Sequence, residues 1–221
     1  MLWQEDDEDD FNFDNGEVID IIYRLEGKTL PNDYSFALFN SILTHAPWLQ
    51  ENPQVGIHLV IAGEEGNGWM REDDPSQVMY LSRRTRLLLR IPTALTDEAE
   101  SLVNKTLAVA EHQLQIKSCE QQPLSQLTTL YARHVASSEA EENAFLENIV
   151  AELTRMNVRC KKLMCGKTRS IATAEETLQT RSLMLADLKP EDAIKIQQHG
   201  LGPHRGLGCG LFVPHKSIKR V

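Results

Sequence analysis

Residues 200–210 form a glycine-rich stretch whose composition suits contact with phosphate. Five glycines occupy these eleven positions, together with His204 and Arg205. Glycine permits positive φ angles and close backbone approach, and successive N–H groups in such loops form nests that bind anions. A helical pattern precedes the stretch and a strand-like run follows it. A dinucleotide-binding fingerprint has the opposite order, and a P-loop ends in Gly-Lys-Ser/Thr. The stretch is therefore either a phosphate-contacting loop that lies across a sheet or a glycine-rich turn packed for steric reasons.

Seven histidines supply candidate groups for proton transfer at neutral pH. Imidazole has an ordinary pKa of about 6.5, so it can act as a general acid or base. His58 and His134 alternate with neighbours in strand-like segments and are expected to be structural or surface residues, and His199 lies at a helix end. His204 lies in the glycine-rich stretch. His45 follows a helical pattern, where a histidine can also stabilise the helix dipole.

The composition is ordinary for a globular protein. The 221 residues are enough for one large domain or two small ones. No apolar run approaches the length that spans a bilayer, and the N-terminus is acidic where a signal peptide would carry a basic region. A cytoplasmic location is therefore expected. The four cysteines have no Cys-x-x-Cys spacing, so we expect reduced thiols, no metal and no cofactor.

The charges are distributed unevenly along the chain. The net charge is −9, but residues 1–154 hold 10 Lys and Arg against 27 Asp and Glu, whereas residues 155–221 hold 13 against 5. Such an asymmetry indicates a nucleic-acid-binding face. Two basic clusters are candidates for it, and each can instead be a solvated charged face. The first comprises Arg83, Arg84, Arg86 and Arg90, of which Arg84, Arg86 and Arg90 share a strand face, and the second comprises Lys161, Lys162, Lys167 and Arg169.

The order of the predicted elements is βαββαβ, repeated once. Asp33 is expected to cap the first helix, and Ser138 with Glu141 is expected to form a capping box for the third. The first unit has strands at 18–25, 55–62 and 107–116, with helices at 33–45 and 97–106. Residues 78–91 contain strand material that is split by Arg83, Arg84 and Arg86. The second has strands at 127–136, 158–164, 180–188 and 211–213, with helices at 138–156 and 190–199 and a basic loop at 167–169. This predicts an α+β fold of two tandem ferredoxin-like units with a C-terminal glycine-rich loop. The predicted division is an acidic disordered tail (1–16), an N-terminal domain (17–119), a linker (120–125) and a C-terminal domain (126–221).

Two segments resemble a known family. They are residues 200–214, which read GLGPHRGLGCGLFVP, and residues 25–34, which read LEGKTLPNDY. The first is similar to the glycine-rich loop of the RAMP superfamily, and more narrowly of the sixth CRISPR-associated protein family, in the MYXAN-type subfamily. The resemblance covers roughly residues 17–216. It implies a metal-independent endoribonuclease that cleaves CRISPR repeat RNA into guide RNAs and leaves 2′,3′-cyclic phosphate and 5′-hydroxyl ends.

The resemblance also implies partners and site residues. It implies that the enzyme stays bound to its RNA in a type I interference (Cascade-like) complex. The acidic tail, judged from its charge, either is solvated or docks on a basic partner subunit. The alternative is a non-catalytic RNA-binding subunit of a CRISPR ribonucleoprotein. A catalytic histidine on or just after the first helix corresponds to His45, with His204 as its rival and Tyr34 and Ser41 as assisting residues. Lys28 is a candidate for stabilising phosphorane charge. The expected RNA contacts are Gly202, His204, Arg205, Gly206, Gly208 and Gly210, with Arg84, Arg86, Arg90, Lys161, Lys162, Lys167 and Arg169 from the basic clusters.

Overall fold

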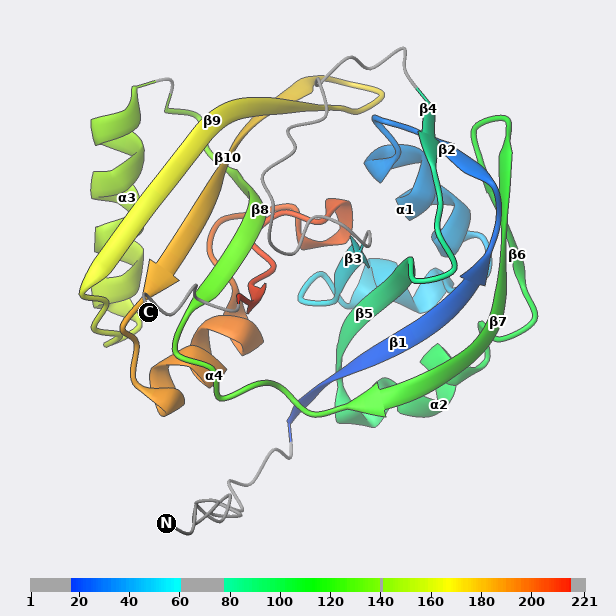
Figure 1. Ribbon diagram of the computed structural model, residues 1–221, viewed down its shortest axis with the longest axis horizontal. Helices are drawn as coiled ribbons and strands as arrows, with labels where there is room; N and C mark the ends of the chain where they lie inside the picture. Colours follow the sequence, from blue (N-terminus) through cyan, green and yellow to red (C-terminus); the bar gives the residue numbers. More distant parts are fainter. Residues whose placement is uncertain (1–16, 61–77, 140, 216–221) are drawn as a thin grey trace, which may run out of the picture.

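The structure is a computed structural model that describes residues 17–60, 78–139 and 141–215 (Figure 1). The predicted acidic tail lies outside these residues. None of the described helices is long and apolar enough to cross a bilayer. The described part of the chain contains two large antiparallel sheets, one from each half of the sequence, with the glycine-rich stretch between them.

The first unit is a ferredoxin-like fold with one added edge strand. Its main sheet has the order β3-β5-β1-β7-β6, in which β3, β5, β1 and β7 form the ferredoxin-like set and β6 is the addition. A small sheet of β2 and β4 lies apart from it. The elements are β1 (Val18–Glu26), β2 (Thr29–Pro31), α1 (Ser35–Leu43), a 3-10 helix (Pro47–Glu51), β3 (Gly56–Val60), β4 (Val78–Tyr80), β5 (Arg86–Pro92), a 3-10 helix (Thr93–Leu95), α2 (Thr96–Glu100), β6 (Thr106–Val109) and β7 (His112–Gln122).

The second unit repeats the same arrangement. Its sheet has the order β11-β8-β10-β9, and α3 and α4 are the crossover helices. The elements are β8 (Leu130–Ala136), α3 (Glu142–Arg155), β9 (Lys162–Ala172), β10 (Thr177–Ala186), α4 (Pro190–His199), a 3-10 helix within the glycine-rich stretch (Arg205–Leu207) and β11 (Val213–Pro214). The predicted fold class, two tandem ferredoxin-like units, is confirmed.

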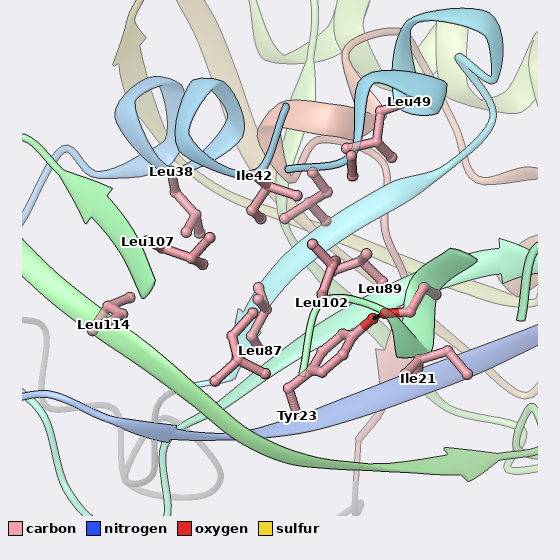
Figure 2. Close-up of a cluster of buried hydrophobic side chains, with 14 of the residues drawn as sticks. Ile21, Tyr23, Leu38, Ile42, Leu49, Leu87, Leu89, Leu102, Leu107 and Leu114 are labelled. Carbon is pink, nitrogen blue, oxygen red and sulfur yellow. Dashed lines mark hydrogen bonds between the residues drawn. The ribbon is translucent and has the colours of Figure 1, made fainter. Parts of the chain in front are cut away.

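Each unit has its own hydrophobic core. In the first, Leu38 and Ile42 of α1 pack on the face of the sheet that carries Ile21 and Leu87 (Figure 2). Tyr23 lies in the same core, and its buried hydroxyl has a hydrogen-bond partner because it donates to the Ala99 carbonyl at 2.7 Å. In the second, the apolar stripe of α3 predicted from its helical spacing is buried at Phe145, Ile149 and Leu153, whereas Val150 is 54% exposed.

Arg90 of β5 joins the two units. Its guanidinium is 1% exposed and forms a bidentate ion pair with Asp20 of β1. Its Nη1 also donates to the carbonyls of Gln197 in α4, at 3.1 Å, and Phe212, at 2.7 Å. The sequence predicts that Arg90 shares an RNA-binding face with Arg84 and Arg86, but its buried guanidinium instead bridges the first sheet to α4 and Phe212.

Two predicted segments have a different secondary structure. The strand predicted at 107–116 is a hairpin, because Ala110 adopts a positive φ of 52° and turns the chain between β6 and β7. The basic stretch 167–169, predicted to be a loop, lies inside β9, which pairs with β10 from Lys162 to Ala172.

Neither predicted helix cap is present. The Asp33 carboxylate accepts a hydrogen bond from the backbone N–H of Ala172 in the second unit, at 2.9 Å, and Tyr34 occupies the N-cap position of α1. Helix α3 begins at Glu142, with Glu141 at the N-cap position and no hydrogen bond from a capping side chain. Ser138 therefore precedes the helix and does not occupy its N-cap position.

Candidate active site

The glycine-rich stretch follows α4 and is attached to β8 by its backbone. The N–H of Gly210 donates to the carbonyl of His134 at 2.7 Å, and Cys209 forms a parallel bridge with His134. Gly210 has a φ of 67°, and a Cβ placed there would lie 2.2 Å from the Leu201 carbonyl oxygen. This position therefore requires glycine, both for its backbone angle and for its space.

The same stretch also packs on the first unit. A Cβ on Gly206 would lie 2.8 Å from the ring of Phe39 in α1, and one on Gly208 would lie 3.2 Å from the Ile57 carbonyl of β3. The Nε of Arg205 donates to the Gln54 carbonyl at 2.8 Å. The glycine-rich stretch (the glycine loop below) thus lies between the units, where it contacts both (Figure 1).

A narrow pocket lies where α1, β3, β8 and the glycine loop meet. Its polar lining comes from Tyr34, Ser35 and His58 in the first unit and from Arg133 and His134 in the second. The rest of the wall consists of Leu38, Ile57, Gly206, Leu207 and Gly208. Its volume of about 10 Å³ is roughly that of one water molecule. A nucleotide cannot enter such a space, but a phosphate at its mouth can be contacted by the side chains that line it.

The surroundings keep both pocket histidines neutral at physiological pH. Burial, with Arg133 and Arg90 nearby, lowers the pKa of His58 to about 4. Burial, with Arg133, Arg169 and His58 nearby, lowers the pKa of His134 to about 3. Both imidazoles are therefore unprotonated and weak bases in the free protein, and an anion bound beside them would raise their pKa values and so strengthen them as bases.

Tyr34 and Arg133 form the other half of the pocket. Burial raises the pKa of the Tyr34 phenol, an effect that the nearby Arg133 opposes and Asp33 reinforces, so the phenol keeps its proton. Burial lowers the pKa of the Arg133 guanidinium, and Tyr34 partly offsets this. Arginine remains charged at neutral pH. The pocket therefore combines a hydroxyl donor, a cation and two neutral imidazoles.

Hydrogen bonds fix the orientation of the His134 ring. Its Nδ1 lies 2.8 Å from the hydroxyl of Thr180, a residue that is 1% exposed. The Thr180 hydroxyl also lies 3.4 Å from the Arg169 carbonyl. The contact with Thr180 therefore holds the imidazole ring of His134 in place, and the tautomer decides which of the two atoms donates.

The other predicted catalytic residues lie outside the pocket. His45 is exposed after the end of α1, and its Nε2 lies 3.1 Å from the Thr106 carbonyl of β6. Ser41 is 7% exposed and buried within α1. His204 is exposed and lines a larger groove of about 540 Å³ beside α3. Of the predicted catalytic side chains, the structure brings only Tyr34 to the pocket.

The predicted RNA-binding side chains differ in their accessibility. Arg205 is 7% exposed, and its Nη1 and Nη2 atoms have no hydrogen-bond partner among the described residues. Burial and the nearby Arg90 lower its pKa to about 10, so it stays charged. Arg169 is half-buried near Arg133, and Arg86 is half-buried. Arg84, Lys161, Lys162 and Lys167 are exposed, and Lys162 pairs with Asp187 at 3.0 Å.

Sequence reasoning missed His58, Arg133 and His134 as site residues. His58 pairs with Leu88 across β3 and β5, on the sheet face opposite the helix-covered core. Arg133 and His134 of β8 lie at an irregularity in the pairing with β10, where the register shifts from Arg181 to Leu183. Their only sequence signal was alternation within strands, which does not tell which distant strand or loop covers a face.

The fold and the placement of the loop define a tandem ferredoxin-like protein with a glycine loop between its units. Residues 19–217 match the family model described as Cas6 Crispr. The chain therefore belongs to the Cas6 family. It is 28% identical over 204 residues to the CRISPR-associated endonuclease Cas6 of Myxococcus xanthus strain DK1622, which covers 92% of this chain and 84% of that protein.

Solved structures share the fold at low sequence identity. A structure titled as the characterization of a Cas6-related gene from Pyrococcus furiosus has a TM-score of 0.60 and 13% identity, covering 92% of this chain and 100% of that one. A structure titled as an RAMP protein binding different RNA substrates has a TM-score of 0.56 and 12% identity, covering 88% and 98%.

Proposed function

We propose that this protein is a metal-independent endoribonuclease that binds CRISPR repeat RNA and cleaves precursor transcripts into guide RNAs. The pocket between the units is the observation that carries the proposal, because it places Tyr34, His58, Arg133 and His134 beside the glycine loop. The family membership and the endonuclease name of the Myxococcus relative support the same reaction.

The proposed reaction is an internal transesterification. The 2′-hydroxyl oxygen attacks the neighbouring phosphorus, its proton passes to a base, and the bond from phosphorus to the 5′-oxygen breaks. The 5′-oxygen takes a proton from an acid, so the products are a 2′,3′-cyclic phosphate and a 5′-hydroxyl. The step needs a base, an acid and stabilisation of the negative phosphorane.

The pocket residues have the chemistry for these three roles. A neutral imidazole of His58 or His134 can accept the 2′-hydroxyl proton, and the protonated phenol of Tyr34 can donate to the leaving 5′-oxygen. The Arg133 guanidinium can stabilise charge on the phosphorane. His45 remains the alternative acid or base implied by the family resemblance, with Ser41 as a possible assistant, although neither lies in the pocket.

RNA binding involves the surfaces around the pocket in this proposal. The backbone of the glycine loop and the exposed Lys161, Lys167 and Arg84 contact phosphates, while Arg169 acts next to the pocket. The protein stays bound to its product as a subunit of a type I interference (Cascade-like) complex in the cytoplasm. A non-catalytic RNA-binding subunit is the alternative function, since the glycine loop serves binding in both cases.

Cleavage in the absence of divalent metal tests the proposal. Purified protein is incubated with end-labelled CRISPR repeat RNA in excess EDTA, and the ends of the products are identified by phosphatase and kinase treatment. We expect sustained cleavage with 2′,3′-cyclic phosphate and 5′-hydroxyl ends. Tight binding without product would instead support the non-catalytic subunit.

A further inference from the structure

The segment that connects β4 to β5 presents an aromatic ring and arginines to solvent. Tyr80 at the end of β4 is 78% exposed, and Arg83 and Arg84 in the following turn are exposed as well. An exposed ring beside cations is the combination with which proteins bind unpaired nucleotides, because bases stack on the ring while the cations hold phosphates.

The segment is ordered by its own hydrogen bonds. The N–H of Leu81 donates to the Lys28 carbonyl at 2.9 Å. The turn is closed by Ser82 and Thr85, since each donates its N–H to the other, at 3.2 Å to Thr85 Oγ1 and 3.0 Å to the Ser82 carbonyl. Thr85 is 1% exposed. RNA binding would therefore lose less conformational entropy than it would if these residues had to become ordered on binding.

Two further arginines lie next to each other on neighbouring strands, Arg86 at the start of β5 and Arg24 in β1. Arg86 lies directly opposite Arg24 across β5 and β1. The Nη1 of Arg86 donates to the carbonyls of Arg83 and Thr85, at 2.8 and 2.9 Å, which fixes its guanidinium against the turn. Like charges directly opposite each other destabilise a sheet.

No carboxylate among the described residues neutralises this pair. The nearby Glu26 is paired with Lys117 at 2.6 Å, and Ser118 lies opposite Arg24 on its other side. Glu120 is exposed two positions further along β7, opposite Ile22, and forms no ion pair within the described residues. An anion that binds both guanidiniums would relieve their repulsion.

We propose that Tyr80, Arg83, Arg84, Arg86 and Arg24 form a binding surface for single-stranded RNA. Tyr80 stacks on a base, and the arginines hold the phosphates on either side of it. The inference rests on the proposed function and deepens it, since it names unpaired nucleotides of the RNA substrate as the ligand of this surface. Strand β2, which pairs with β4, is followed closely by Asp33, whose carboxylate accepts a hydrogen bond from the N–H of Ala172 in the second unit. Strand β2 therefore connects this surface to the contact between the two units.

The test measures binding of a fluorescein-labelled 12-nucleotide oligouridine by anisotropy, at salt concentrations from 50 to 300 mM. We expect Tyr80→Ala to weaken binding by about 5- to 100-fold and Tyr80→Phe to retain it, because the ring face does the stacking. Arg83→Gln with Arg84→Gln should reduce the slope of log K against log salt by about 0.7 per arginine. Arg155→Gln is the matched control, since its side chain is 74% exposed on α3.

The outcomes separate this surface from the cleavage site. Thermal melts of every variant establish that it is folded. The inference is overturned if the natural chain fails to bind oligouridine. It is also overturned if affinity and salt slope are unchanged in the folded Tyr80→Ala and Arg83→Gln/Arg84→Gln variants. Either result is expected if the surface instead binds a protein or the chain's own acidic residues. Tyr34→Phe should leave oligouridine binding intact, so loss of cleavage in that variant concerns only the proposed function.

Discussion

Arg90 and Asp20 form a bidentate ion pair in the interior between the two units, with Nε to Oδ1 at 2.7 Å and Nη2 to Oδ2 at 2.8 Å. Asp20 is 7% exposed. The remaining bonds of the guanidinium reach the carbonyls of Gln197 and Phe212, so one side chain connects the first sheet to both α4 and the residue before β11.

Removing this guanidinium should destabilise the protein strongly. Arg90→Met leaves the Asp20 carboxylate buried without its partner, which costs about 3–5 kcal/mol in comparable pairs. We expect that loss in the free energy of unfolding, measured by urea denaturation. Arg24→Met removes an exposed arginine from the neighbouring strand and should cost less than about 1 kcal/mol. Equal losses in the two variants would contradict the structural role of Arg90.

The pocket histidines should make stability depend on pH between about 6.5 and 4. The pKa values of His58 and His134 are about 4 and 3 in the folded chain, against about 6.5 when unfolded. The unfolded chain therefore binds more protons in this range, so stability is full above pH 6.5 and falls as the pH is lowered. Melting temperatures at pH 7.5, 6.5, 5.5 and 4.5 measure this.

Variants assign that dependence to the pocket. His58→Gln should flatten the loss of stability between pH 6.5 and 5, above the range in which most carboxylates titrate. His45→Gln changes an exposed histidine and should leave the profile as it is. A steep profile that survives in both His58→Gln and His134→Gln would show that other groups cause it.

The positive φ of Gly208 should limit which residues are tolerated there more than the space available for a side chain does. Its φ is 85°, and an added Cβ would meet the Ile57 carbonyl oxygen at 3.2 Å. Gly208→Val should lower the melting temperature and RNA affinity, because a β-branched residue resists positive φ. Gly208→Asn should lose less, since asparagine tolerates the left-handed region. Valine and asparagine variants that both match the natural protein would show that the loop conformation is unimportant.

Arg205 should act as an anchor for the glycine loop. It is 7% exposed, and its Nε donates to the Gln54 carbonyl of the first unit. We expect Arg205→Gln to lower the melting temperature and leave the salt dependence of RNA binding unchanged. A slope of log K against log salt reduced by about 0.7–0.9 would instead support the phosphate contact predicted from the sequence.

Local signals predicted the fold well where neighbours in sequence decide the structure. Helix α4 spans the predicted Pro190–His199, with proline in its first turn and Gly200 at its C-cap with a φ of 69°. The site was harder to predict because it depends on contacts between distant segments. Asp33 has the residue type of a helix cap, yet it binds Ala172. His58 has an ordinary strand position, yet burial, with Arg133 and Arg90 nearby, lowers its pKa.

Single-turnover cleavage of CRISPR repeat RNA in EDTA, compared between Tyr34→Phe, His58→Gln, His134→Gln and His45→Ala, tests the central claim most directly. If the pocket between the units carries the chemistry, Tyr34→Phe and at least one of the pocket histidine variants should be slower by about 10²–10⁴-fold. Their RNA affinity should be nearly unchanged, because an uncharged group releases no counterion, and His45→Ala should cleave at close to the natural rate. Normal cleavage by the three pocket variants together with an inactive His45→Ala would contradict the account and place the catalytic histidine after α1.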